Sequence, residues 1–279
     1  MTRPSRIALH EKVIFITGAG SGIGATVAEL AYAHGSKVVL VDVNPSIDSL
    51  ADRLGDRAFA VHGDVTSRSE MELAAKRAVD TFGRIDIVFA NAGIAADPPT
   101  TIAAMLPEVL EQVIAVDLHG VYRTVHATLP QIRANNGHIL LTASIYAYVN
   151  GVVNAPYAMS KAAVEMFGRS LRSELAGTGA TAGVLYPGWT RTPIVNSAFG
   201  GNQAVTELIE TVFPRSLRTL VSTTEVAEAA LAGMTRRSAR IHVPKRWAAV
   251  SAGRGLVNPL TDLLLDRYAK VHKLVRKLE

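Results

Sequence analysis

Short apolar runs alternate with longer helical patterns along most of the chain, and this alternation constrains the fold more than any other feature of the sequence. The runs are rich in Val and Ile, which is typical of strands that are buried on both faces of a sheet. The helical stretches between them supply the crossovers that parallel strands require. The sequence therefore predicts an α/β fold with a doubly wound parallel β-sheet flanked by helices on both faces.

The apolar runs also define where the strands are expected. No internal repeat, low-complexity segment or linker interrupts the series, so we expect a single domain over residues 1–250, followed by a distinct extension over 251–279. Helices are expected at 22–35, at 67–83 and from about Pro156 onward. The expected strands are 12–17, 37–42, 57–65, 85–93, 137–144 and 181–188.

Composition excludes several classes of protein. The 279 residues include no cysteine, which excludes disulfides, thiolate chemistry and cysteine-ligated zinc. The eight histidines are scattered without ligand spacing, so no metal site is expected. The chain has no signal-peptide pattern and no apolar run of membrane-spanning length, which indicates a cytoplasmic protein.

The positive charge is concentrated near the C-terminus. The formal net charge is +5, but residues 236–279 hold eleven Lys/Arg against three Asp/Glu, a net +8 that leaves −3 for the remainder. The high pI is therefore a property of this segment and gives no support for nucleic-acid binding by the whole domain.

A glycine-rich turn, ITGAGSGIG at 16–24, joins the first strand to the first helix. Gly18, Gly22 and Gly24 lack side chains where the backbone must turn sharply and approach a ligand. The helix that follows directs free N–H groups and the positive end of its dipole at the same place, which suits a pyrophosphate.

Asp42 ends the second strand, 18 residues after Gly24. A carboxylate at this point can accept hydrogen bonds from both hydroxyls of an adenosine ribose, and it would repel the 2′-phosphate of NADP. Neither Ser21 nor Val43 is basic, so NAD is the expected cofactor. The alternative is that Asp42 is simply a carboxylate in the turn after a strand.

Tyr157 and Lys161 lie four residues apart on the helix that opens near Pro156 and therefore share a face. A lysine ammonium near a phenol favours the phenolate and lowers its pKa from about 10, which makes a proton donor and acceptor usable near neutral pH. Taken alone, the same spacing also arises by chance.

The ordered motifs together resemble the short-chain dehydrogenase/reductase family over residues 10–243, and the resemblance implies its Rossmann-like fold. Ser144 precedes Tyr157 by 13 residues, and Lys161 follows, as in the family's catalytic pattern. The other matching segments are Thr17-Gly18-x-x-x-Gly22-Ile23-Gly24, Asp64-Val65, Asn91-Ala92-Gly93 and Pro187-Gly188 with Thr190 and Thr192.

The resemblance implies an NAD(H)-dependent oxidoreductase that interconverts an alcohol and its ketone or aldehyde. Ser144 would position the substrate oxygen, Tyr157 would act as general acid and base, and Lys161 would lower the pKa of the tyrosine. Family members commonly form tetramers through helices that here cover 119–134 and 155–177, so a homotetramer is expected, with a dimer as the alternative. The implied cofactor-binding residues are Gly18, Ser21, Gly22, Ile23, Gly24, Asp42, Asp64, Val65, Asn91, Ala92, Gly93, Tyr157, Lys161, Pro187, Gly188, Thr190 and Thr192.

One position departs from the family pattern. The segment VDLHG puts Asp117 where the family usually has asparagine, whose backbone carbonyl holds a water in a relay to the lysine. Any residue supplies that carbonyl, but a carboxylate nearby can change the pKa of the lysine. We therefore expect Asp117 to be a site member with an altered role.

Apolar side chains on both sides of the catalytic motif predict a pocket for an apolar alcohol, expected to be secondary, or its ketone. They include Tyr146, Tyr148, Val149, Val152 and Val153 before Tyr157, and Ile194, Val195, Phe199, Val205, Leu208, Ile209, Val212 and Phe213 after Thr192. The same residues would also suit inward packing, and Arg191, Arg215 and Arg218 would suit a carboxylate or a thioester carrier.

From Pro259 onward, Leu260, Leu264, Tyr268, Val271, Val275 and Leu278 recur at helical spacing among lysines and arginines. This basic amphipathic extension is expected to dock on protein, or alternatively on an anionic membrane surface. Two other functions stay open: a catalytically idle NAD-binding sensor or scaffold, and a peripheral membrane protein that acts mainly through this extension.

Overall fold

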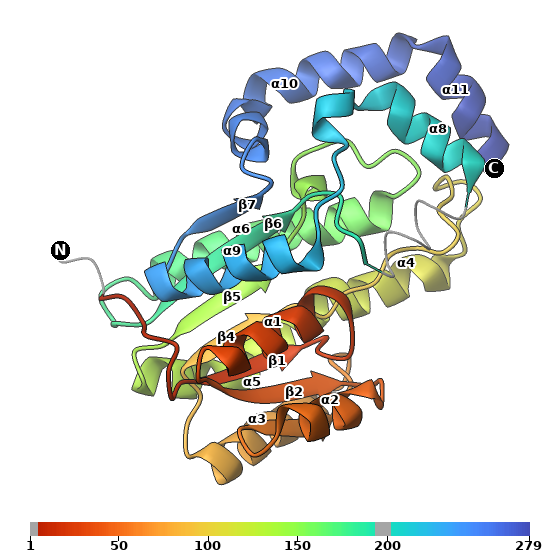
Figure 1. Cartoon of the computed structure of the whole chain (residues 1–279). Coiled ribbons are helices and arrows are strands. Elements are labelled where there is room, and N and C mark those ends of the chain that lie inside the picture. Colours follow the sequence, from red (N-terminus) through yellow and green to blue (C-terminus); the bar gives the residue numbers. More distant parts are fainter. Residues whose placement is uncertain (1–4, 193–201) are drawn as a thin grey trace.

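The computed structural model describes residues 5–192 and 202–279, and within them seven strands form one parallel sheet. The strand order is β3-β2-β1-β4-β5-β6-β7, so the winding direction reverses between β1 and β4 (Figure 1). This confirms the doubly wound sheet. The strands are β1 Val13–Thr17, β2 Lys37–Asp42, β3 Ala58–His62, β4 Ile87–Ala90, β5 His138–Thr142, β6 Thr181–Pro187 and β7 Arg240–Val243.

Helices cover both faces of this sheet and form two separate apolar cores. On one face, α1 (Gly22–Ala33) packs beside α9 (Thr223–Arg236), with α2 (Ser46–Leu54) next to them. On the other face, α3 (Arg68–Phe82) and α6 (Ala155–Glu174) contribute to the larger core. The central strands are buried throughout because both of their faces are covered.

A continuous helical segment on this second face changes its geometry in the middle. It consists of α4 (Pro107–Ile114), the π-helical η1 (Ala115–Gly120) and α5 (Val121–Ala134). A π-helix bonds residue i to residue i+5 and so holds more residues per turn than an α-helix. Asp117 and Gly120 are buried within η1.

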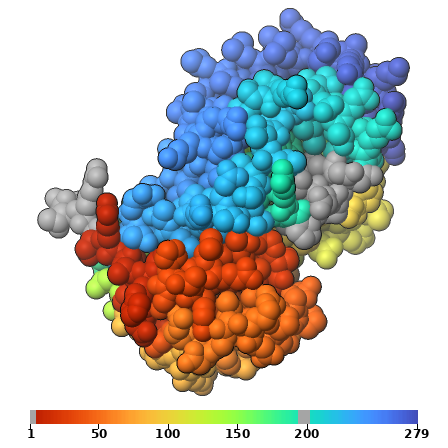
Figure 2. All heavy atoms as spheres, viewed as in Figure 1, coloured from red at the N-terminus to blue at the C-terminus, as the bar shows by residue number. Residues whose placement is uncertain are grey.

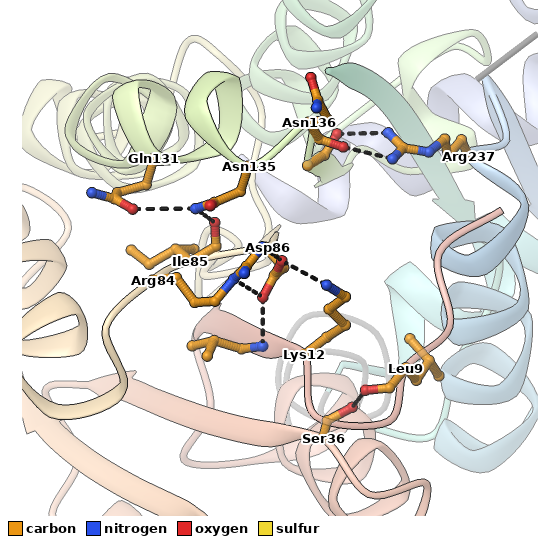
Figure 3. Close-up of polar contacts among 12 residues, drawn as sticks. Leu9, Lys12, Ser36, Arg84, Ile85, Asp86, Gln131, Asn135, Asn136 and Arg237 are labelled. Carbon is orange, nitrogen blue, oxygen red and sulfur yellow. Dashed lines mark hydrogen bonds and ion pairs between the residues drawn. The ribbon is translucent and has the colours of Figure 1, made fainter. Parts of the chain in front are cut away.

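Buried charges at the amino ends of the strands are satisfied within the fold (Figure 3). Asp86 accepts hydrogen bonds from the Nζ of Lys12 at 3.2 Å, the backbone N of Val13 at 3.1 Å and the Nε of Arg84 at 3.0 Å. Arg237 donates to the carbonyl of Gly137 at 2.8 Å and also to the carbonyl of Asn136. Asp86 and Arg237 therefore stabilise the fold, because their hydrogen bonds are made to other groups of the protein itself.

The amphipathic helix that was expected from Pro259 onward is divided between two helices in the structure. Helix α10 spans Trp247–Arg267, and the backbone then turns at Tyr268, where φ is −89° and ψ is 98°. Helix α11 (Ala269–Val275) and η5 (Arg276–Leu278) follow. Val271 and Leu278 are buried against α8 (Gln203–Val212), whereas Leu260, Leu264 and Tyr268 are exposed, so the expected stripe does not form one continuous face.

Within the described residues, no helix combines the length and the hydropathy needed to cross a membrane.

Candidate active site

A cavity of about 670 Å³ opens at the carboxyl ends of the strands, and it contains nearly all of the residues that the sequence predicted for the site. They reach it from the ends of β1, β2, β3, β4, β5 and β6 and from helix α6. Gly24 and Asp117 are the two predicted members that do not line it. The predicted residues that line it are Gly18, Ser21, Gly22, Ile23, Asp42, Asp64, Val65, Asn91, Ala92, Gly93, Ser144, Tyr157, Lys161, Pro187, Gly188, Thr190 and Thr192.

The glycine-rich turn depends on conformations and contacts that larger residues would oppose. Gly18 and Gly22 have φ values of +67° and +54°, in the left-handed region where a side chain is strained. A Cβ on Gly24 would lie 2.0 Å from the carbonyl O of Gly18, so Gly24 allows the helix to pack closely under the turn. Ser21 precedes α1 without a side-chain cap, which leaves helix N–H groups directed at the cavity.

Asp42 lies at one end of the cavity in a fixed orientation. Its Oδ2 accepts a hydrogen bond from the backbone N of Gly20 at 2.8 Å, and its Oδ1 accepts one from Asn44 at 2.9 Å. Among the described residues that line the cavity, Lys161 is the one Lys or Arg, and it belongs to the opposite, catalytic group. The end near Asp42 therefore presents a carboxylate without a cation.

Asn91 connects three strands at the middle of the cavity. Its Nδ2 donates to the carbonyl O of Thr17 at 3.3 Å, at the end of β1, and its Oδ1 accepts from the Oγ1 of Thr142 at 3.2 Å, at the end of β5. Asp64 closes its own turn by accepting a hydrogen bond from the backbone N of Thr66 at 2.7 Å. These bonds hold the strand ends at fixed positions around the cavity.

Ser144, Tyr157 and Lys161 meet at the other end. Ser144 precedes the 3₁₀ turn η2 (Ile145–Ala147), and its Oγ accepts a hydrogen bond from Tyr146 at 3.2 Å. The Nζ of Lys161 lies 5.2 Å from the centre of the Tyr157 ring, which confirms that the two side chains share one face of α6.

Asp117 lies directly behind this lysine, and both side chains are almost completely buried. Its Oδ2 is 3.0 Å from the Nζ of Lys161 and accepts a hydrogen bond from the Oγ of Ser160 at 3.2 Å. Its Oδ1 accepts one from the backbone N of Ile94 at 2.7 Å. The carboxylate is thus a partner of the lysine instead of a wall of the cavity, and removal of either charge would leave the other buried and unpaired.

The pKa shifts at this site differ from the simple expectation of a lowered tyrosine pKa. Burial raises the pKa of Tyr157, and the positive charge of Lys161 opposes this effect, while Asp117 adds to it, so the net direction is upward. Burial also raises the pKa of Asp117 against the influence of Lys161. For Lys161, burial is the largest influence and acts to lower the pKa, but the charges of Asp117 and Tyr157 and the hydrogen bond to Asp117 together outweigh it, and the pKa is raised.

The structure adds apolar wall residues that the sequence analysis did not name as site members, and three of them are large side chains next to the catalytic motifs. Ile94, Ile145 and Trp189 line the cavity beside Tyr146. Each lies immediately next to a recognised motif residue, namely Gly93, Ser144 and Gly188. Their position next to a motif at a strand end was therefore the sequence signal that could have identified them as wall residues.

The apolar residues expected after Thr192 have different positions. Val205 and Leu208 pack against α11 in a separate apolar cluster, in agreement with the alternative of inward packing. Ile194, Val195 and Phe199 lie outside the described residues. Arg218 pairs with Glu210 at 3.0 Å, and neither Arg191, Arg215 nor Arg218 lines the cavity.

Comparisons with known proteins agree with this geometry. The family model described as short chain dehydrogenase matches residues 12–203. Momilactone A synthase of Oryza sativa subsp. japonica is 35% identical over 71% of this chain and 73% of its own. Borneol dehydrogenase, mitochondrial, of Lavandula x intermedia is 33% identical over 80% of this chain and 83% of its own.

A solved structure also matches most of the chain. It is a short chain dehydrogenase/reductase from Burkholderia phymatum in complex with NAD, with a TM-score of 0.76 and 25% identity, and the match covers 90% of this chain and 94% of that one. The matched segment includes the glycine-rich turn, the strand ends around the cavity and the Ser144, Tyr157 and Lys161 group. The chain therefore belongs to the short-chain dehydrogenase/reductase family of oxidoreductases, which act on CH–OH donors.

Proposed function

We propose that this protein interconverts an apolar, secondary alcohol and its ketone or aldehyde with NAD(H). The observation that carries the proposal is a single cavity with Asp42 at one end and Ser144, Tyr157 and Lys161 at the other. A dinucleotide bound along this cavity would place its adenosine at Asp42 and its nicotinamide at the catalytic group. The reacting carbon of the substrate must lie beside the nicotinamide.

The residues of the cavity fit this cofactor. The uncapped start of α1 suits the pyrophosphate, and the Asp42 carboxylate suits the hydroxyls of the adenosine ribose. Asn91, at the end of β4, and Thr190, after β6, also line this cavity. When bound, NAD(H) supplies the hydride chemistry, and the protein supplies position and electrostatic field.

The proton chemistry belongs to the side chains of this chain. Tyr157 would transfer a proton to or from the substrate oxygen, and the hydroxyl of Ser144 would hold that oxygen by a hydrogen bond. Lys161 would favour the ionised tyrosine through its positive charge, as the direction of its influence on the pKa of Tyr157 indicates.

The walls beside Tyr157 support an apolar substrate. Ile94, Ile145, Tyr146 and Trp189 face this end of the cavity. Similar proteins include ones named momilactone A synthase, borneol dehydrogenase and tropinone reductase-like 1. A bulky cyclic secondary alcohol is accordingly the first substrate class to examine.

A screen of alcohols with NAD, followed by absorbance of the NADH formed, tests the proposal. We expect turnover of cyclic apolar secondary alcohols at rates that exceed those of short polar alcohols by about tenfold or more, because the cavity wall offers apolar contact. If NAD binds with ordinary affinity but no alcohol or ketone in a broad panel reacts, the catalytically idle sensor would be the better description.

Asp117 is proposed as a positioning residue that also raises the pH at which the enzyme oxidises alcohol. Its negative charge, held close to Lys161, reduces the influence of that lysine on Tyr157 and raises the pKa of Tyr157. The Asp117→Asn variant should therefore oxidise alcohol at lower pH than the wild type. We expect the acid limb of the kcat/KM profile to shift downward by on the order of one pH unit.

An exposed carboxylate provides the control for this shift. Asp80 pairs with Lys76 on the surface of α3, and Asp80→Asn makes the same chemical change away from the cavity. Its profile should coincide with that of the wild type. If Asp117→Asn lowers kcat uniformly at every pH, the carboxylate only orients the lysine and does not set the pH dependence.

A homotetramer is proposed as the assembly, with a dimer as the alternative. Tyr122 on α5 and Met159 and Met166 on α6 are large apolar side chains that remain about half exposed in the isolated chain. Burial of such a surface between α5 and α6 of neighbouring copies would remove it from water. Light scattering at micromolar concentration should give a multiple of the 29.7 kDa chain, and a monomeric mass would exclude the assembly.

A further inference from the structure

Helix α10 contributes little to the core despite its length. Of its 21 residues the structure buries Trp247 alone, whereas the 20-residue α6 has seven buried residues. It is held to the body by polar contacts, which include the Arg254 Nη1 to Glu165 Oε2 pair at 2.7 Å and a 3.0 Å hydrogen bond from Asn150 to Asp262. Its outer side is therefore free for another contact.

That outer side carries an apolar stripe. Five large side chains on it are between 44% and 79% exposed, although leucine and tyrosine usually lose water contact in a folded domain. The leucines are separated by one, three and four residues and lie within one side of the helix, and Tyr268 follows directly after its last residue, Arg267. The apolar stripe consists of Leu256, Leu260, Leu263, Leu264 and Tyr268.

A basic patch continues the stripe at its carboxyl end. Helix α11 and η5 bury their apolar residues against the body, which leaves the charged residues between them outward. In the part of the chain that the structure describes, no carboxylate lies within ion-pair distance of the basic patch. The basic patch consists of Arg267, Lys273, Arg276 and Lys277.

Both features lie at one extremity of the molecule. In Figure 2 the blue atoms of α10 and α11 form the end that is farthest from the orange atoms of α2 and α3. A flat partner could approach this end without contact with the rest of the protein.

We propose that the apolar stripe and the basic patch bind the surface of an anionic lipid bilayer. An interfacial helix lies in the plane of the headgroups with its apolar side toward the acyl chains and its cations at the anionic headgroups. Exposed leucines, a tyrosine at the end of the stripe and neighbouring cations are the side chains that such a surface binds. This binding is independent of hydride transfer and goes beyond the proposed function.

Charge favours a bilayer over a second copy of the chain. The basic patch has four cations without an ion-pair partner among the described residues, so two identical surfaces placed face to face would bring these like charges together. An anionic bilayer has the opposite sign and attracts each basic residue near it. The partner is therefore identified as anionic lipid by charge complementarity.

Vesicle flotation with the full-length chain tests the proposal. One set of vesicles contains phosphatidylcholine alone, and the other contains roughly one third phosphatidylglycerol. We expect binding to the anionic vesicles to be about tenfold or more tighter, and to weaken when NaCl rises from about 50 to about 500 mM. Equal binding to both sets, or no binding, would overturn the proposal.

Three variants separate the stripe from the patch. Leu260→Asp with Leu264→Asp should reduce binding by about tenfold or more, since charged groups replace the central apolar contacts. Lys273→Gln and Lys277→Gln should each reduce it about fivefold, which corresponds to about 1 kcal/mol per basic residue. The matched control, Leu73→Asp with Leu220→Asp, adds the same negative charge at two exposed leucines elsewhere on the protein. Its binding to vesicles should fall only by the effect of that charge, and therefore less than the binding of the stripe variant.

Light scattering of the same variants distinguishes the competing occupant. If the wild type fails to bind vesicles and the Leu260→Asp, Leu264→Asp variant dissociates an oligomer, the stripe is an interface between copies and the proposal is wrong. Thermal unfolding and NAD binding, measured on each variant, identify any loss that comes from misfolding, and an unfolded double variant would be replaced by Leu260→Ser with Leu264→Ser.

Discussion

Tyr157→Phe is expected to lower kcat by about a thousandfold while the dissociation constant for NAD stays within about twofold of the wild-type value. The ring of Tyr157 remains in place beside Lys161, so the wall of the cavity keeps its shape. Only the oxygen that transfers the proton is lost. Stopped-flow or steady-state NADH absorbance measures the first quantity, and fluorescence titration with NADH measures the affinity.

Tyr148→Phe is the matched control. Tyr148 is buried a few residues before Tyr157, does not line the cavity, and its hydroxyl has no hydrogen-bond partner among the described residues. Removal of that hydroxyl should leave kcat close to that of the wild type. A Tyr157→Phe enzyme that keeps most of its turnover would remove this tyrosine from the mechanism.

The second large effect concerns cofactor choice at Asp42. The wild type should prefer NAD to NADP by about tenfold or more in kcat/KM, because the carboxylate would face the 2′-phosphate of NADP. Two like charges a few ångströms apart and partly shielded from water cost about 2–4 kcal/mol, which is roughly 30- to 1,000-fold in affinity. Asp42→Ala combined with Val43→Arg should narrow or reverse the preference, since Val43 is exposed and an arginine there can reach the phosphate.

Kinetics with both cofactors check this expectation. Asp48→Ala serves as the control, because Asp48 is an exposed carboxylate on the neighbouring α2 that pairs with His62. It should leave the preference unchanged. Equal use of NADP by the wild type would mean that Asp42 does not bind the ribose and that another basic residue holds the phosphate.

Six of the seven strands in the described residues, and the positions at their ends, were predictable because they depend on local patterns, whereas the short, partly exposed β7 was not expected. Runs such as KVVLVD lie within the buried sheet, and the parallel arrangement carries each run's last polar residue to the same edge. Asp42, Asn91 and Ser144 reach the cavity for this reason, although they are far apart in the sequence. Their positions at the strand ends therefore follow from the local pattern, whereas their roles in the site were taken from the resemblance to the family.

The electrostatics and the C-terminal helices were not predictable in the same way. The net pKa shift of Tyr157 depends on burial and on Asp117, whose distance from Lys161 is set by tertiary packing. The regular spacing from Pro259 onward does not reveal the turn at Tyr268, which allows α11 to pack on α8. Both outcomes depend on contacts between distant segments, which outweigh local preference.

The π-helical segment η1 makes the position of Asp117 depend on the number of residues as well as on their identity. Packing on the sheet fixes the register of α5, and η1 accommodates one more residue than an α-helix would in the same turn. Deletion of one residue between 118 and 120 would restore regular α-helical bonding and rotate the preceding residues, Asp117 included, by about 100° relative to α5. Asp117 would then turn away from Lys161, so a single insertion or deletion during evolution is enough to connect this carboxylate to the catalytic lysine or to disconnect it.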